Sequence, residues 1–598
     1  MYTLGIYDGH NAGCSLIDGK NILFSTEEER FSRIKGHDGR LEQHGLPVKS
    51  LGLILKSFGK KYKISKIALA LKDSLSLRNL SLLHWAEAIK DSKDYNIIKF
   101  YTKPNIKKQK KLRLNQNQYI DISFSTQQKR IDRLLKLLKD FGLSKCEIEF
   151  VPHHLAHHAS SWYTSNKKTG LAISLDGRGD ALSGMVSVCY KNKIKPIHEI
   201  SSFNSIGHFY SAVTVALGFK AVRHEGKITG LAAYGSVDKK LIKKFNNLIW
   251  FNSNAGSIFS LLYTGSEYGP YPWANFKLYI DKIKNEVVSY PREVIAATAQ
   301  LHLENVVKKF VSYWVKKTGL KDVYLSGGVF ANVKLNQKIS NIKKIKSLVV
   351  HPGMTDCGIS LGAALFVNSK KPKKMQSHYY LGISKSNQIK KIISLNKINA
   401  TKPKDISVVI ANALAEKKII ARYCDNSEYG PRALGNRSIL FHAGDPSVND
   451  FLNKKLSRTE FMPFAPVTID EDVNKSYIIP KNIDITESMK YMTITVNCTP
   501  YMKKNCPAVV HVDGTARPQI IYPQQNFAYY KILKKYKELT GIGSLINTSF
   551  NMHEEPIVES PKDALRAFIL SGLDILILGE YIIHKKDLIH LKKTWYLN

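Results

Sequence analysis

The order of apolar and polar residues predicts an alternation of strands and helices along the chain. Residues 3 to 26 alternate as two strands around an Asp-Gly pair, which is a common hairpin turn. Helical periodicity runs from 130 to 141, before a strand at 146 to 151. Short apolar runs at 171 to 175 and 323 to 325 end in glycine-rich turns, where a strand can deliver a loop to a phosphate or a metal. The pattern predicts an α/β protein.

A polar, basic and proline-bearing stretch at 366 to 377 predicts a domain boundary. The 598 residues exceed what one hydrophobic core usually supports, so more than one domain is expected. A strand at 419 to 423 and a helix at 561 to 571 indicate a second α/β domain. We predict a first domain over 1–368 with a basic insertion around 75–125, a linker over 369–378 and a second domain over 379–598.

A run of histidines is the strongest single indication of chemistry. His153-His154-Leu-Ala-His157-His158 places imidazoles four residues apart twice, at the start of a predicted helix. Side chains at i and i+4 share one face, so His153 with His157, or His154 with His158, can hold one metal ion. The residues alone leave both pairs open.

Two aspartates in glycine-rich settings can complete such a site. Asp176 lies in Leu-Asp-Gly-Arg-Gly-Asp and Asp356 in Met-Thr-Asp-Cys-Gly. Mixed nitrogen and oxygen ligands suit iron, manganese or zinc better than a soft thiolate site does. Histidines on helices are more often incidental, but four within six residues favour a metal site.

The charge balance indicates a polyanionic partner. The chain has 89 Lys and Arg against 49 Asp and Glu, a net charge of +40. Residues 103 to 113 form the densest basic segment, for which nucleic-acid contact and a solvated charge run are equally good interpretations. The candidate nucleic-acid contacts are Lys107, Lys108, Lys110, Lys111 and Arg113.

Other bulk features predict a cytoplasmic protein without membrane association. No apolar run reaches membrane-spanning length, and the N-terminus has the pattern of a strand, not of a signal peptide. The seven cysteines are scattered without a C-x-x-C pair, which fits reduced thiols. The sequence leaves a monomer and a homodimer open.

Three glycine-rich segments of the first domain are candidates for anion or nucleotide binding. The turn at 7 to 13 combines Gly, Asp and His after a strand, although a hairpin turn has a similar composition. In Leu325-Ser-Gly-Gly-Val-Phe-Ala-Asn332, two glycines allow close backbone approach to a nucleotide, and an ordinary strand-to-helix turn is the alternative. Lys227, in Glu-Gly-Lys-Ile-Thr-Gly, can meet a phosphate or form a structural ion pair.

The second domain carries a dense set of basic and polar residues. Arg432 and Arg437 flank a glycine-proline turn, with Asn453, Lys454 and Arg458 following. Guanidinium groups around such a turn suit bidentate recognition of phosphate or carboxylate. Further polar loops occur at 511 to 517 and 547 to 551.

Taken together, these motifs resemble the O-carbamoyltransferase family, which includes the nodulation-factor and antibiotic carbamoyltransferases. The resemblance runs in order from residue 4 to residue 582. The motifs that carry it are His153-His-Leu-Ala-His157, Asp176-Gly-Arg-Gly-Asp180, Glu225-Gly-Lys227, Gly327-Gly328, Gly430-Pro-Arg-Ala-Leu-Gly435, Pro463-Phe-Ala-Pro466, His511-Val-Asp-Gly-Thr-Ala-Arg517 and Asn547-Thr-Ser-Phe-Asn551.

The resemblance implies the architecture and the reaction. The first domain would be actin/Hsp70-like (ASKHA class, Kae1-like), close to the tRNA threonylcarbamoyl transferase, and the second would be a YrdC-like α/β domain. By that analogy carbamoyl phosphate and ATP, with Mg²⁺, react in the second domain to give carbamoyl adenylate and pyrophosphate. The adenylate moves to the first domain, where an acceptor hydroxyl attacks the carbamoyl carbon and AMP leaves.

The resemblance also assigns roles to residues. It selects His153, His157, Asp176 and Asp356 as metal ligands, with Fe²⁺ favoured and Mn²⁺ or Zn²⁺ as alternatives. His10 is expected to be a general base or orienting group, and His154 a group on the acceptor side. The expected nucleotide-binding residues are Gly177, Gly179, Lys227, Gly327, Gly328 and Asn332. For carbamoyl phosphate and ATP in the second domain, they are Arg432, Arg437, Ser438, Asn453, Lys454, Arg458, Arg517, Asn547 and Ser549.

The family does not define the acceptor. The net charge of +40 favours a polyanion, and a hydroxymethylated base in DNA, or a nucleotide, is the sharpest hypothesis. The alternatives are a small molecule such as a sugar, an antibiotic or another secondary metabolite, a tRNA-modifying threonylcarbamoyl transferase, and a nucleotide-dependent nucleic-acid-binding protein without catalysis.

Overall fold

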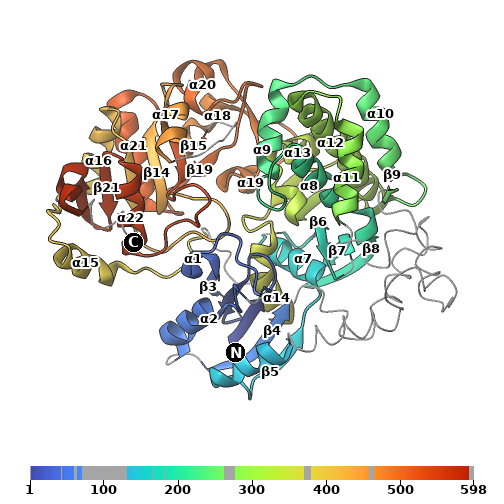
Figure 1. Cartoon of the computed structure of the whole chain (residues 1–598), viewed down its shortest axis with the longest axis horizontal. Coiled ribbons are helices and arrows are strands. Elements are labelled where there is room, and N and C mark those ends of the chain that lie inside the picture. The colour runs from blue at the N-terminus through green and yellow to red at the C-terminus, as the bar shows by residue number, and fades with distance from the viewer. Residues whose placement is uncertain are drawn as a thin grey trace. The chain divides into compact units, whose positions relative to one another are not determined.

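A computed structural model describes residues 2–19, 21–41, 43–59, 63–70, 131–165, 167–180, 182–261, 276–368, 379–456 and 464–591. These residues form two compact units (Figure 1). The first comprises Met1–Asn21, Asp38–Met375 and Asn482–Asp484, and the second comprises Ile22–His37, Gln376–Lys481 and Ile485–Asn598. The predicted linker at 369–378 and the whole of the predicted basic insertion lie outside the described residues.

The N-terminal strands belong to a sheet of order β3-β2-β1-β4-β5. Its strands are β1 (Tyr2–Tyr7), β2 (Gly13–Ile17), β3 (Ile22–Glu27), β4 (Ile64–Ala70) and β5 (Glu147–Phe150). β1 pairs antiparallel with β2 and parallel with β4, which pairs parallel with β5. Residues 3 to 26 thus form three strands instead of the predicted two, because a turn with Asn11 at φ 61° separates β1 from β2.

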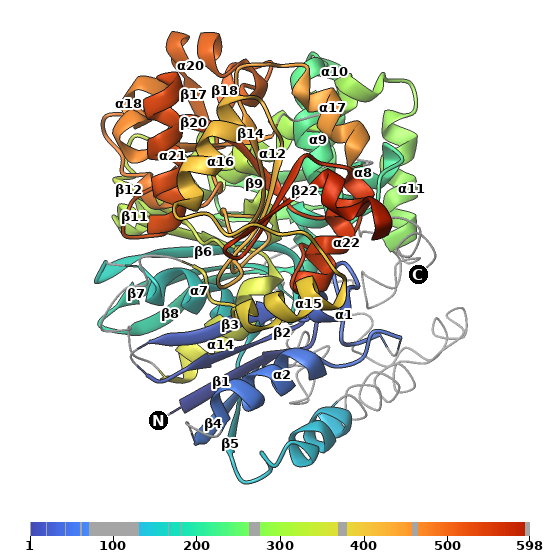
Figure 2. The same cartoon turned by 90° about the vertical axis from the view of Figure 1, so that its left-hand side faces the viewer.

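A second sheet of the first unit repeats this topology. Its order is β12-β11-β6-β7-β8, with β6 antiparallel to β7, β7 antiparallel to β8, and β6, β11 and β12 parallel (Figure 2). The strands are β6 (Thr169–Gly179), β7 (Leu182–Tyr190), β8 (Lys193–Ser201), β11 (Asp322–Ser326) and β12 (Ser347–Val350). The mixed α/β class predicted from the sequence is confirmed.

Two helices of the first unit approach each other closely. α7 (His153–Tyr163) begins after Pro152, whose ψ of 139° is extended and whose carbonyl accepts from Ala156 N at 3.0 Å. α14 (Ile359–Asn368) packs against α7 and β1. A Cβ at Gly362 of α14 would lie 1.9 Å from Ala156 O of α7, so the contact requires glycine. The start of α14 is thereby held beside the histidines of α7.

The other regular elements of the first unit are mostly helical. They include α2 (Val48–Ile54), the predicted helix at residues 131–140, α8 (Ile206–Ala216), α9 (Glu225–Leu231), α10 (Lys239–Leu248), β9 (Ile249–Asn252), β10 (Ser257–Ser260), α11 (Phe276–Val287), α12 (Arg292–Thr318) and α13 (Val333–Ser340). α12 ends at Gly319, which has φ 71° and donates its N–H to Val315 O.

A seven-stranded sheet of order β19-β15-β20-β14-β13-β21-β22 forms the second unit. Its strands are β13 (Ile420–Tyr423), β14 (Arg437–His442), β15 (Ala465–Ile469), β19 (Gln519–Ile521), β20 (Ser544–Ser549), β21 (Ile575–Leu578) and β22 (Tyr581–His584). A smaller sheet contains β16 (Tyr477–Ile478), β17 (Val496–Cys498) and β18 (Thr515–Ala516). The predicted strand at 419–423 and helix at 561–571 correspond to β13 and α22 (Pro561–Ser571).

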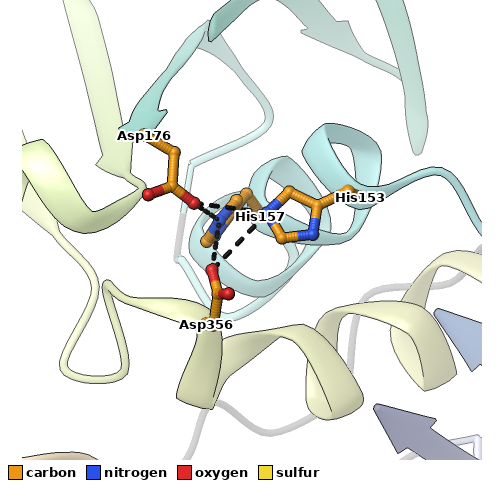
Figure 3. Close-up of side chains that lie close together, drawn as sticks. All are labelled: His153, His157, Asp176 and Asp356. Carbon is orange, nitrogen blue, oxygen red and sulfur yellow. Dashed lines mark hydrogen bonds and ion pairs between the residues drawn. The ribbon is translucent and has the colours of Figure 1, made fainter. Parts of the chain in front are cut away.

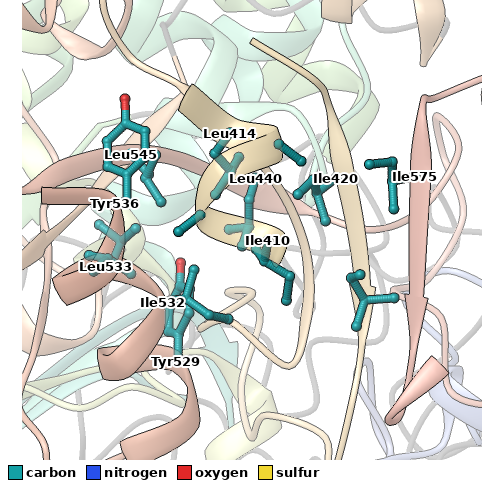
Figure 4. Close-up of a cluster of buried hydrophobic side chains, with 14 of the residues drawn as sticks. Ile410, Leu414, Ile420, Leu440, Tyr529, Ile532, Leu533, Tyr536, Leu545 and Ile575 are labelled. Carbon is teal, nitrogen blue, oxygen red and sulfur yellow. The ribbon is translucent and has the colours of Figure 1, made fainter. Parts of the chain in front are cut away.

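Two helices cover one side of this sheet with apolar residues. Ile410 and Leu414 of α16 (Ile406–Ala415) meet Tyr529 and Leu533 of α21 (Phe527–Thr540) in one buried cluster (Figure 4). The remaining helices of the unit are α1 (Glu29–Ser32), α15 (Ile389–Leu395), α17 (Val448–Lys455), α18 (Val473–Ser476), α19 (Thr486–Lys490) and α20 (Pro500–Asn505). The finer assignment of this unit as YrdC-like stays a prediction.

Within the described ranges, every helix is too short or too polar to cross a bilayer.

Candidate active site

Four ligand-type side chains converge in the first unit. His153 and His157 of α7 face Asp176, near the end of β6, and Asp356, just before α14 (Figure 3). The Nε2 atom of His153 is 3.3 Å from Asp176 Oδ2 and 3.5 Å from Asp356 Oδ1. The Nε2 atom of His157 is 3.5 and 3.6 Å from the same two oxygens. The structure thus selects the His153 and His157 pair that spacing alone left open.

The spacing of these atoms fits a metal ion. Two ligand atoms bound to one first-row metal at about 2.1 Å lie about 3.0 to 3.4 Å apart. The four ligand atoms of this cluster lie within 4.8 Å of one another, and both imidazoles are completely buried. Burial lowers the pKa of His157, but Asp176 and Asp356 outweigh burial and raise its pKa above the ordinary value. Two carboxylates, one buried and one partly buried, therefore favour a cation at this position.

The other two histidines of the run face the sheet. His154 Nδ1 is 2.9 Å from Ser174 Oγ of β6, and His158 Nδ1 is 2.9 Å from Ser187 Oγ of β7. Burial lowers the pKa of His158 to about 3, so this imidazole is neutral at pH 7. Both histidines anchor α7 on the sheet. The structure does not bring His154, predicted as an acceptor-side group, to the four ligand atoms.

Each aspartate uses one carboxylate oxygen for the cluster and the other for a support. Asp176 Oδ1 accepts from its neighbour Gly177 N at 2.7 Å, and Asp356 Oδ2 accepts from the Tyr7 hydroxyl at 2.6 Å. Burial and the charge of Asp356 raise the pKa of Tyr7 well above its usual value, so Tyr7 remains a hydrogen-bond donor. Sequence reasoning did not identify Tyr7, because its partner lies 349 residues away.

Replacing Tyr7 by Phe is expected to weaken metal binding about 10- to 100-fold, because supports of this kind orient the ligand. Titration of metal-free protein with Fe²⁺ or Zn²⁺ measures the effect. The matched control is Tyr210→Phe, since the Tyr210 hydroxyl donates to Gln300 at 2.7 Å and contacts none of the four ligands. Equal affinity in the two variants would contradict the assigned support.

His10 lies beside a fixed ion pair. It forms an isolated β-bridge with Asp38, whose carboxylate accepts from Arg40 Nε at 2.9 Å and from Arg40 Nη2 at 2.6 Å. Burial raises the pKa of Asp38, but Arg40 and the nearby His10 outweigh burial and lower it. Asp38 and Arg40 were not predicted from the sequence, which offers only the general signal of charged residues beside glycine.

The predicted glycines surround the cluster. A Cβ at Gly179 would lie 2.1 Å from His153 Cδ2, and one at Gly328 would lie 3.0 Å from Asp176 Oδ1. Gly327 adopts φ 96° and donates its N–H to Met354 O at 2.6 Å. Gly177 would place a Cβ 3.3 Å from His208. These backbones leave space for the metal ligands.

Asn332 and Lys227 lie on other elements. Asn332 caps α13 by accepting from Leu335 N at 3.0 Å, and its amide donates to Gln300 Oε1 at 2.8 Å. Lys227 is buried on α9, with Nζ 5.9 Å from the centre of the Phe219 ring. The Asn332 side chain is thus bound to Gln300 of α12. Sequence reasoning missed Gln300, which lies 32 residues earlier in the chain.

In the second unit, a buried network holds the loop from Gly430 to Asn436. Glu428 Oε1 accepts from the backbone N–H groups of Leu434, Asn436 and Arg437 at 2.8, 2.8 and 3.0 Å. The Arg437 guanidinium stacks on Tyr423 at 3.8 Å and donates to the carbonyls of residues 424, 425 and 436. Sequence reasoning missed Glu428, which organises the loop.

The other predicted residues of this unit lie around that loop or on nearby elements. Ser438 Oγ accepts from Gly435 N at 2.9 Å, and Asn547 donates to Ala433 O at 3.1 Å. Four of the predicted residues are partly exposed, namely Arg432, Asn453, Arg517 and Ser549. Lys454 is exposed. Arg458, Lys107, Lys108, Lys110, Lys111 and Arg113 lie outside the described residues.

Two family models match the chain. The model described as Carbamoyltransferase N-terminus matches residues 2–365, and the one described as Carbamoyltransferase C-terminus matches residues 411–585. Nodulation protein NolNO of Sinorhizobium fredii is 30% identical, over 75% of this chain and 66% of its own length. Nodulation protein NolO of Bradyrhizobium diazoefficiens is 31% identical, over 73% of this chain and 79% of its own length.

Likeness to solved structures is weaker. HypF of T. kodakarensis is similar with a TM-score of 0.35 and 12% identity, over 61% of this chain and 47% of its own. Component A of the (R)-2-hydroxyglutaryl-CoA dehydratase of Acidaminococcus fermentans gives a TM-score of 0.32 and 13% identity, over 62% of this chain and 99% of its own. The two family matches, which between them cover most of the chain, show that it belongs to the carbamoyltransferase family and is a carbamoyltransferase enzyme.

Proposed function

We propose that this enzyme moves a carbamoyl group from carbamoyl phosphate, through carbamoyl adenylate, to an acceptor hydroxyl. The observation that carries the proposal is the cluster of His153, His157, Asp176 and Asp356, within the part of the chain matched by the N-terminal family model. The arginine-bearing loop of the second unit offers a chemically different site for anions. Two sites suit a reaction with separate activation and transfer steps.

Activation is proposed for the second unit. Carbamoyl phosphate first loses phosphate to water, leaving carbamate. A carbamate oxygen then attacks the α-phosphorus of ATP, bound with Mg²⁺, and pyrophosphate leaves. Arg432 and Arg517 are the proposed partners of the phosphate charges, because guanidinium groups bind phosphate oxygens in pairs.

Within this activation site, Arg437, Ser438 and Asn547 give the loop its shape. Their described hydrogen bonds go to backbone groups and to Gln519. Asn453, Lys454, Arg458 and Ser549 stay predictions for this site.

Transfer is proposed for the first unit. His153, His157, Asp176 and Asp356 would hold Fe²⁺, with Mn²⁺ or Zn²⁺ as alternatives for the same ligands. When bound, the metal supplies Lewis acidity toward the phosphate and carbamoyl oxygens. The glycines at 177, 179, 327 and 328 keep side chains away from this position, so that the backbone can approach the nucleotide closely.

His10 is proposed as the group that takes the proton of the acceptor hydroxyl. The hydroxyl oxygen forms the bond to the carbamoyl carbon, the bond to the phosphate oxygen breaks, and AMP leaves. The Asp38 carboxylate lies near His10 and would stabilise the positive charge that the imidazole gains in this step. His154 stays a prediction for the acceptor side, and its contact with Ser174 also holds α7 on the sheet.

The test is incubation with labelled carbamoyl phosphate, ATP and a panel of hydroxymethylated DNA, nucleotides and sugars. We expect pyrophosphate release that depends on carbamoyl phosphate, and label in one acceptor class. A non-catalytic binder releases no pyrophosphate, and a threonylcarbamoyl transferase acts on tRNA without carbamoyl phosphate. Absence of pyrophosphate release, or modification of tRNA without carbamoyl phosphate, would contradict the proposed reaction.

For the acceptor, we propose a hydroxymethylated base in DNA, supported by the net charge of +40. Such a base must be single-stranded or flipped out of the duplex. A small sugar or antibiotic is the alternative. The family relatives named NolNO and NolO are nodulation proteins, and their names do not specify this acceptor.

DNA binding by the enzyme is expected to weaken steeply with salt. Replacing Lys107, Lys108, Lys110 and Lys111 by Ala is expected to reduce the slope of log affinity against log salt by about 3 to 4, because each phosphate contact contributes about 0.7 to 0.9. Fluorescence anisotropy with labelled DNA at several salt concentrations measures this slope. Salt-independent activity on a free sugar would exclude DNA as the acceptor.

A further inference from the structure

A segment near the N-terminus is part of the second unit. Residues Ile22–His37 contact residues more than 300 positions later in the chain, beginning with Ser25 N, which donates to Leu381 O at 3.1 Å. We propose that Arg30 in this segment is a positioning residue for the substrate site of the second unit. This inference rests on the proposed function and assigns a role to a residue outside the motifs used above.

Arg30 reaches the start of the arginine-bearing loop directly. Its side chain is 2% exposed, and Nη2 donates to Gly430 O at 3.0 Å. Gly430 has φ 88°, a conformation that L side chains rarely adopt. The bond from Arg30 therefore holds the carbonyl of a glycine in a left-handed conformation, two positions before Arg432.

The loop is held from both of its ends. Glu428 accepts three backbone N–H groups at the far end of the loop, while Arg30 donates to the carbonyl at its start. Arg432 lies between these two supports. Its backbone position therefore depends on a residue 400 positions earlier than Gly430.

Buried acids make the guanidinium of Arg30 difficult to replace. Glu27 Oε2 is 3.6 Å from Arg30 Nε, and Glu428 and Glu559 are each at most 4% exposed. Burial lowers the pKa of Arg30, but Glu27, Glu29, Glu559 and Glu428 raise it, so the side chain stays charged. Removing one partner leaves the remaining acids uncompensated.

Arg33 anchors the same segment at another point. Its Nη1 and Nη2 atoms donate to Ile557 O and Pro556 O at 2.8 Å each, and Nε is 3.7 Å from Asp563. These contacts do not involve the loop from Gly430 to Asn436. Arg33 therefore provides a matched control that disturbs the segment without the bond to Gly430.

The test compares Arg30→Met, Arg30→Lys and Arg33→Lys in the full-length enzyme. For Arg30→Met we expect the KM for carbamoyl phosphate in pyrophosphate release to rise about 10- to 100-fold, the effect of losing a charged hydrogen bond. Metal affinity of the first unit should be unchanged. Arg30→Lys should recover part of the loss, and Arg33→Lys should have a near-normal KM.

Three results would overturn the positioning role. One is an unchanged KM in folded Arg30→Met. Another is equal KM increases in Arg30→Lys and Arg33→Lys, which would indicate a general role of the segment in stability. The third is a fall in kcat with no change in KM for any variant. Absence of pyrophosphate release from the unmodified enzyme would instead refute the proposed function, so the two failures are distinguishable.

Discussion

Replacing His157 by Ala is expected to abolish metal binding and carbamoyl transfer while pyrophosphate release continues. The imidazole is completely buried, and its Nε2 faces both Asp176 and Asp356. Its removal takes away one of four ligands and leaves two carboxylates facing a single histidine. Bound metal per chain, transfer of label to the acceptor and carbamoyl-phosphate-dependent pyrophosphate release are measured on the same preparation.

The matched control is His158→Asn, one residue along the same helix. His158 contacts Ser187 instead of the cluster, and asparagine keeps a hydrogen-bonding group near that serine. This variant is expected to lose about 1 to 3 kcal/mol of stability and to retain its metal. If folded His157→Ala lost pyrophosphate release as well as transfer, the division of the two steps between the units would be wrong.

The periodicity of apolar residues predicted strands and helices correctly where burial alone determines them. The strand β13 and the helix α22 were predicted from their apolar patterns, and in the structure α22 begins with a capping box of Ser560 and Asp563. The predicted hairpin turn at Asp18 and Gly19 joins β2 to β3, but the number of strands over residues 3 to 26 was wrong. A left-handed Asn11 breaks what looks like one alternating strand, and asparagine in that conformation is not distinguishable by composition.

The candidate metal site shows what spacing can and cannot predict. Helical spacing limited the histidines to two pairs, but the choice between them depends on the rotation of α7 about its axis. That rotation follows from contacts far away in sequence, namely Ser174, Ser187 and the close approach of Gly362 to Ala156. The family resemblance selected the pair that the structure brings together.

Supports that come from distant segments were missed for the same reason. Tyr7 and Arg30 show no motif of their own, and each donates a hydrogen bond to a segment that sequence analysis had named. Their partners lie up to 400 residues away in the chain. A pattern within a window of some 15 residues cannot report such contacts.

Replacing Gly179 by Ala is expected to disrupt the metal site as severely as loss of a ligand. A Cβ there would lie 2.1 Å from Cδ2 and 2.4 Å from Cγ of His153, far inside van der Waals contact. The imidazole is fully buried, and its helix is fixed on the sheet by His154 and His158, so it cannot move aside cheaply. Metal titration and transfer of label measure the result.

Two other glycines make the comparison specific to this contact. At Gly177 a Cβ would meet His208 at 3.3 Å, and at Gly226 it would meet nothing within 4 Å. Gly226 lies in α9, where alanine favours the helix by about 1 kcal/mol, so Gly226→Ala should bind metal normally with equal or higher stability. Normal metal affinity in Gly179→Ala would mean that His153 can leave its observed position without cost. Contact with His153 would then not be the reason for glycine at position 179. Close approach of the backbone to the nucleotide would be the remaining reason.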